Sequence, residues 1–162
     1  MFREMRRKRQ QLPLSDCVDI LESGTSGVLA LEGDGGYPYA VPMSFAYHDG
    51  KIFFHCAKSG HKIDSIMRNS KASFCVIARD DVRPEKYTTY FKSVIAFGRI
   101  KALEEDSEKR KAIERLALKY NPDADAGEMD AAIEREYAPL CMLELDIEHL
   151  TGKQAKELMS TY

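Results

Sequence analysis

Two histidines stand close together in the segment FFHCAKSGHKIDSI. His55 lies within its apolar part. His61 is flanked by Gly60 and Lys62, and Lys58 comes just before them. An imidazole can give or accept a proton near neutral pH, and lysine ammonium groups attract anions. These residue types therefore suit anion binding, acid–base chemistry, or both.

The pattern around the two histidines predicts a joint between a strand and a helix. Residues 51–57 read as a strand, and residues 59–70 read as an amphipathic helix. The start of a helix offers free backbone N–H groups and the positive end of the helix dipole, and cations are normally disfavoured there. A basic first turn is reasonable if a phosphate binds it. We predict that site at Lys58, Gly60, His61 and Lys62; the alternative is a basic turn that is merely solvated.

Residues 37–47 alternate with a period of two, which is typical of a strand. One face carries the large side chains of Tyr39, Val41, Met43, Phe45 and Tyr47. The other face carries the small side chains of Ala40, Pro42, Ser44 and Ala46. The two prolines at 38 and 42 favour an edge strand or a bulge, because proline cannot donate to a ladder. We expect the large face to pack into the core and the small face to admit a flat group.

The rest of the chain predicts a single α+β domain over residues 1–162. The expected strands cover residues 26–33, 37–47, 51–57, 71–78, 88–103 and 141–147, and the further helices cover residues 15–23, 106–120 and 127–137. A polar loop is expected at 79–87 and a bulge at Gly98. Hairpin-joined strands with helices between them indicate a six-stranded antiparallel sheet with flanking helices, and six strands that must hide their edges suggest a small barrel.

Composition excludes several classes of protein. The net charge is -2, and the one basic cluster lies in an N-terminal arm, residues 1–12, which we expect to be solvated or to pack on a partner subunit rather than to bind nucleic acid. No segment has the length of a membrane helix or the apolar core of a signal peptide. Four widely spaced cysteines predict reduced thiols in a cytoplasmic protein and no metal site.

Three blocks, YPYAVPMSFAYHDGKIFFHCAKSGHKIDSIMRN, FKSVIAFGRIKAL and LELDIEHLTGKQA, resemble the 5-nitroimidazole-resistance (Nim) proteins. These belong to the flavin-binding split-barrel group related to pyridoxamine 5'-phosphate oxidase. The resemblance runs from about residue 5 to residue 156. It implies a six-stranded split β-barrel, a homodimer with FMN at each subunit interface, and reduction of a nitro group on a small aromatic substrate.

The same resemblance assigns roles to individual residues. It places the FMN phosphate at Lys58, Gly60, His61 and Lys62, and the flavin ring along Val41, Pro42, Met43 and Ser44, with Ser93 and Val94 as further candidates. It makes His55 the candidate for chemistry. No side chain can itself carry a hydride, so redox chemistry requires a cofactor.

Two other hypotheses stay open. One is an oxidase that acts on a pyridoxamine-type vitamer, although no second phosphate site is evident. The other is a flavin- or haem-binding protein without turnover, in which His55 or His61 would be an axial haem ligand.

Overall fold

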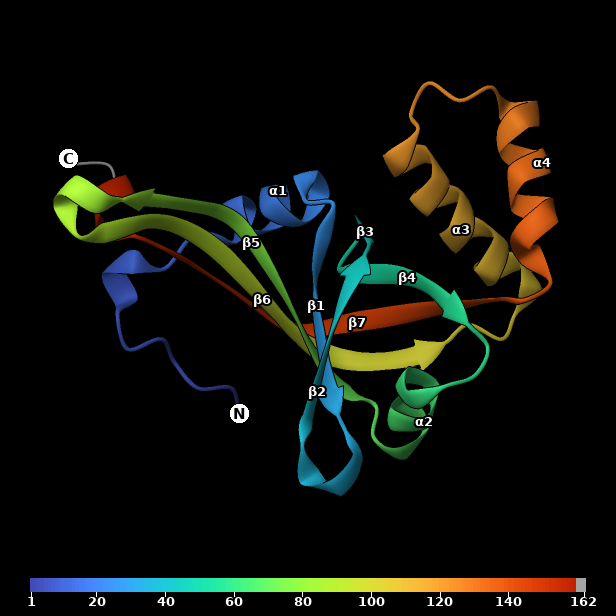
Figure 1. Ribbon diagram of the computed structural model, residues 1–162, viewed down its shortest axis with the longest axis horizontal. Coiled ribbons are helices and arrows are strands. Elements are labelled where there is room, and N and C mark those ends of the chain that lie inside the picture. The colour runs from blue at the N-terminus through green and yellow to red at the C-terminus, as the bar shows by residue number, and fades with distance from the viewer. Residues whose placement is uncertain (160–162) are drawn as a thin grey trace.

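The computed structural model describes residues 1–159. It consists of one curled antiparallel sheet with four helices around it (Figure 1). The strands are β1 (Ser26–Glu32), β2 (Pro38–Ser44), β3 (Ala46–His48), β4 (Lys51–Ala57), β5 (Lys71–Arg83), β6 (Thr88–Ala102) and β7 (Leu140–Gln154). The helices are α1 (Leu14–Ser23), α2 (His61–Arg68), α3 (Asp106–Tyr120) and α4 (Ala126–Tyr137).

The sheet has seven strands in the order β2-β1-β5-β6-β7-β4-β3, so the expectation of six strands is wrong. The difference arises at Phe45, where the expected strand 37–47 divides into β2 and β3. These two strands follow each other directly in the chain, yet they lie at opposite ends of the sheet order. The sheet must therefore curl until its two edges approach, and it stays open between them. This is an α+β fold with a split, unclosed barrel.

Two strands are longer than the sequence predicts. The expected loop 79–87 shrinks to residues 84–87, because β5 continues to Arg83 and pairs with β6 through a bulge near Ile77. β7 continues past residue 147 to Gln154. The β5 extension, residues 79–83, is mostly exposed, and the β7 extension, residues 148–154, contains one large apolar residue, Leu150, so neither shows the alternation that indicates a strand.

The large face of β2 packs into the core as predicted, with Tyr39, Val41 and Met43 against the main hydrophobic cluster. Three fully buried phenylalanines form the centre of that cluster: Phe74 meets Phe45 and Phe54 edge-on, with ring centroids 4.9 and 5.0 Å apart. A smaller cluster lies on the other side of the sheet, where Phe53 and Met142 contact α3.

Two predictions about the sheet, an edge strand at the prolines and a bulge at Gly98, are confirmed. β2, with its two prolines, is an edge strand that pairs only with β1 in the sheet. The register of β6 against β7 shifts between Phe97 and Gly98, which is the predicted bulge. A side chain at Gly98 would begin 1.9 Å from the Asp146 carbonyl oxygen, so only glycine lets the two strands approach here.

The N-terminal arm is not simply solvated. Leu12 N–H donates to the Gly152 carbonyl, and Gln11 forms a bridge with Lys153 of β7. At the far end of the arm, the Phe2 ring stacks on His149 with centroids 4.6 Å apart. The arm therefore contacts the outer side of its own sheet.

Candidate functional site

The start of α2 is an exposed, uncapped helix terminus. Gly60 is the residue before the helix, with a φ of 119° that side chains rarely adopt, and nothing lies within 4 Å of the position where a Cβ would stand. No side chain caps the first turn. Its N–H groups therefore remain available to an anion. Lys58 and Lys62 flank this turn, and no ion pair or side-chain hydrogen bond among residues 1–159 engages either ammonium group.

His61 already has partners. Its ring stacks on Tyr39 of β2 with centroids 4.0 Å apart, and its Nε2 lies 3.6 Å from the Asp34 carboxylate. Arg68 binds the same carboxylate at 2.8 Å, and this hydrogen bond, with the charge of His61, holds the pKa of Asp34 below its usual range. These contacts fix α2 against the β1–β2 hairpin. They leave Lys58, Lys62 and the backbone as the free groups of the predicted phosphate site.

The small face of β2 is exposed, on the side of the strand opposite to Tyr39, which stacks on His61. Ala40, Pro42 and Ser44 point outward, whereas Val41 and Met43 point into the core. The strand leads from Tyr39, beside the helix start, to Ser44, a span of about 17 Å at the usual rise per residue. A strip of small side chains thus lines the exposed face of β2 between these two ends.

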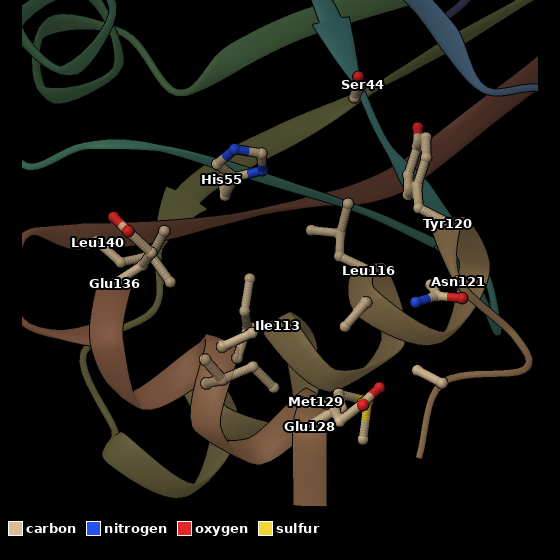
Figure 2. A pocket seen from close by; sticks show the side chains of 14 residues that line it. Ser44, His55, Ile113, Leu116, Tyr120, Asn121, Glu128, Met129, Glu136 and Leu140 are labelled. Atoms are coloured by element: carbon tan, nitrogen blue, oxygen red, sulfur yellow. The ribbon is translucent and has the colours of Figure 1, made fainter. Parts of the chain in front are cut away.

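Ser44 and His55 both line a large cavity between the sheet and the helical hairpin α3–α4 (Figure 2). Its volume is about 640 Å³. Figure 2 shows His55 and Ser44 on the sheet side, with the apolar side chains of α3 and α4 opposite. The helical wall consists of Ile113, Leu116, Ala117, Tyr120, Asn121, Ala124, Glu128, Met129, Ala132, Ile133 and Glu136, and Leu140 follows at the start of β7. A flat apolar molecule in this cavity would lie against the His55 imidazole.

Tyr120 at the end of α3 attaches the helical hairpin to the open edge of the barrel. Its hydroxyl accepts a hydrogen bond of 3.0 Å from Phe45 N–H and donates to the Thr25 carbonyl. Beside it, the Lys119 ammonium lies 4.1 Å from the centre of the Phe45 ring, and burial lowers the pKa of Lys119. The backbone groups released where β2 and β3 divide are thus satisfied by α3.

We expect Tyr120→Phe to lower the free energy of unfolding by about 1–3 kcal/mol, because it leaves the Phe45 N–H without its partner. Urea unfolding followed by circular dichroism would measure the change. Tyr87→Phe is the matched control, since Tyr87 is 99% exposed. Equal stability of the two variants would show that the Tyr120 hydroxyl does not secure the hairpin.

Ser93 and Val94 do not join the site within one chain. Val94 is fully buried in the core, and its strand β6 is paired on both sides. Ser93 lies on the outer face of the sheet, next to Ile77 and Lys153. Strands β1 and β5 separate β6 from β2, which is three strand spacings, or about 14 Å. A cofactor bound by another subunit could reach Ser93 on this outer face, but not the buried Val94 side chain.

Two thiols lie close to the site. Cys56 and Cys141 stand opposite each other on β4 and β7, one residue from His55 and Met142. Burial, with a smaller contribution from Cys141, raises the pKa of Cys56 to about 11. The thiolate is the nucleophile, so Cys56 should be inert near neutral pH.

Alkylation of Cys56 by iodoacetamide, followed by peptide mass spectrometry, tests this. We expect its rate to rise with pH to a midpoint near 11 in the folded protein. In urea the midpoint should return to about 8.5, the ordinary value for a cysteine thiol. A folded-state midpoint at the ordinary value would contradict the effect of burial.

Sequence reasoning missed the helical wall of the cavity. It predicted helices at residues 106–120 and 127–137 but assigned no site residue to them. Leu116 and Ile133 are buried, whereas Ile113 and Met129 are only partly so. Two amphipathic helices inserted before the last strand could have indicated a second, smaller hydrophobic layer. Their shared cavity with His55 depends on how the hairpin docks, which no local pattern reveals.

The sheet forms an open antiparallel barrel, which defines a split-barrel protein. Its candidate ligand site combines the uncapped basic start of α2 with the cavity at the open edge of the barrel. The sequence profile of the pyridoxamine 5'-phosphate oxidase family matches residues 13–154. The chain belongs to this family. No curated protein matches the chain closely enough to count as a relative.

Solved structures share the fold at low sequence identity. One, from Bacteroides thetaiotaomicron, is described as a candidate 5-nitroimidazole antibiotic resistance protein; it has a TM-score of 0.76 and 20% identity, covering 89% of this chain and 86% of the other. A FAD-binding protein from Mesorhizobium loti has a TM-score of 0.66 and 23% identity, covering 90% and 97%. A FAD- and haem-binding protein from Mycobacterium smegmatis has a TM-score of 0.73 and 18% identity, covering 94% and 77%.

Among the helices of residues 1–159, none has the length and apolar character needed to cross a membrane.

Proposed function

We propose that the protein is an FMN-dependent oxidoreductase that reduces a small nitroaromatic or related acceptor. The observation that carries this proposal is the placement of β2 between the basic start of α2, which contacts Tyr39, and the cavity, which Ser44 and His55 line. Family membership and the named flavin ligands of similar structures support a flavin as the cofactor.

The residues present suit FMN. The backbone N–H groups after Gly60, with Lys58 and Lys62, offer a phosphate both hydrogen bonds and charge. The span of about 17 Å along β2 is long enough for a ribityl chain and ring in extended form. Ala40, Pro42 and Ser44 would let the ring lie close to the backbone, and the ring would end beside the cavity.

The cavity supports a small, largely apolar acceptor. Its helical wall is mostly aliphatic, so a planar aromatic molecule would be desolvated there. None of the residues that line it within 1–159 is Lys or Arg. The pyridoxamine-type alternative requires a group that binds the substrate's own phosphate, and this cavity does not offer one.

When bound, the flavin would supply the electrons for reduction. The contribution of the chain is to exclude water and to position the acceptor. His55, exposed on β4 and facing the cavity, would hold a proton on its imidazole and give it to an oxygen or nitrogen of the acceptor as that atom gains negative charge.

We also propose that two copies associate through the outer face of the sheet. Val28 and Ile77 are 37% and 67% exposed there, and Val28, Cys75 and Ile95 stand opposite one another on β1, β5 and β6. A second chain covering this face would carry its own Ser93 toward the first, in keeping with the interface position that the Nim resemblance implies.

Purification with and without added FMN, followed by absorption spectroscopy, tests the cofactor. Flavin bands that persist through gel filtration, and a nitroaromatic-dependent loss of reductant, would support the proposal. A Soret band would favour haem. Protein that binds no flavin, even at high FMN concentration, would overturn the proposal.

A further inference from the structure

The acidic residues on the two faces of helix α4 differ in the ion pairs that they form. On one face, Asp130 and Glu134 bind the Arg110 guanidinium of α3, at 2.6 and 2.5 Å, and Glu114 joins them at 2.8 Å. One cation thus serves three carboxylates and holds the two helices together. The acidic side chains of this face are paired.

The other face of α4 turns toward the cavity. Glu128, Ala132 and Glu136 are spaced four residues apart, so they form one row along the helix, and all three line the cavity. Figure 2 shows Glu128 beside Met129 and Glu136 beside Leu140, both among the side chains around the cavity. Within residues 1–159, Glu128 makes no ion pair, and the partner of Glu136 is Arg135 at 3.7 Å, which is 75% exposed.

The residues that line the cavity therefore include two glutamates and no lysine or arginine. The polar groups on its walls besides the two glutamates are His55, Ser44, Tyr120 and Asn121. The Tyr120 hydroxyl is already bonded to backbone groups of Thr25 and Phe45. Both glutamates are exposed, and the contact between Glu136 and Arg135 is the one ion pair that either makes within residues 1–159, so the cavity carries a negative charge at its solvent-facing wall.

We propose that this cavity selects uncharged and cationic aromatic molecules over anionic ones, and that Glu128 and Glu136 determine this specificity. The inference rests on the proposed function only in treating the cavity as the acceptor site. Acceptors with a protonated amine or a basic heterocycle on an apolar aromatic body would be preferred. Aromatic carboxylates and phosphates would bind more weakly.

Three probes of nearly equal size test the charge preference directly: 2-naphthylmethylamine, 2-naphthalenemethanol and 2-naphthoate. Their Kd values would be measured by titration calorimetry at low ionic strength, with and without bound FMN. We expect the amine to bind most tightly and the carboxylate most weakly. Each exposed carboxylate should account for about a 1.4- to 5-fold difference between charged and neutral probes.

Glu128→Gln and Glu136→Gln, singly and together, should reduce the differences among the three probes. Glu134→Gln is the matched control, because it removes the same charge from the opposite face of α4. Circular dichroism would confirm that each variant is folded, and the single variants keep the test decisive if the double variant is unstable.

Equal affinities for all three probes in the wild-type protein would overturn the proposal, and so would tighter binding of the carboxylate or a charge order that survives in the double variant. Absence of any probe binding would also overturn it. Failure of the flavin proposal is separate: the protein would then bind no FMN, yet the charge order among the probes could still be measured.

Discussion

Replacing His55 by alanine is expected to lower the turnover of a nitroaromatic acceptor by about 10²- to 10⁴-fold, the usual contribution of a positioned proton donor. His55 lies on the cavity wall and faces the apolar surface of α3 and α4. A proton supplied from bulk water would have to enter that apolar space. The FMN affinity should not change, because the imidazole is not among the groups at the start of α2. Steady-state kinetics and FMN titration on the same preparation would measure both quantities.

The control for this variant is His48→Ala, which removes an exposed imidazole at the end of β3. Turnover should be unaffected by it. Added imidazole should restore part of the activity to the His55→Ala protein, since a small donor can enter the space left by the ring. Unchanged turnover in His55→Ala would remove its catalytic role, and a parallel loss of FMN binding would make it a structural residue.

Elements whose side chains meet the core were predictable from sequence. The alternation of residues 37–44 is that of an edge strand with one packed face, and Tyr39, Val41 and Met43 do pack inward. The strand count was not predictable in the same way. The period of two runs without a break through Phe45, yet the strand divides there, and the Phe45 N–H donates to the distant Tyr120 hydroxyl. No local preference encodes a contact 75 residues away.

The residues of the predicted site also differ in whether the sequence alone could show that they lie close together. His55, Lys58 and Gly60 are near in sequence, so one strand–helix joint brings them together. Ser44 joins His55 only because the sheet curls. Ser93 lies on the outer face, away from the cavity, and Val94 is buried in the core. The glutamates of α4 reach the cavity only through the docking of the helical hairpin. The residues at the start of α2 are thus neighbours in the sequence, whereas the residues that line the cavity come from elements far apart in the chain.

Lys58→Ala and Lys62→Ala are each expected to weaken FMN binding by about 10- to 150-fold, which corresponds to about 1.5–3 kcal/mol for a hydrogen bond to a charged group. Both ammonium groups flank the uncapped turn at Gly60 and have no acidic partner among residues 1–159. Quenching of FMN fluorescence on titration would give the Kd values. Lys71→Ala, an exposed lysine beyond the other end of α2, should leave them unchanged.

The structure changes what should be expected of His61, the other cation at this turn. Its ring is held between Tyr39 and the Asp34 carboxylate, and a carboxylate at 3.6 Å competes with a phosphate for the same imidazole. His61→Ala should therefore weaken FMN binding less than either lysine substitution. If His61→Ala is instead the most damaging of the three, the phosphate lies over the His61 ring, and Asp34 must move away when FMN binds. Riboflavin, which has no phosphate, should bind the wild type and all three variants with nearly equal affinity, because the lysines act on the phosphate alone.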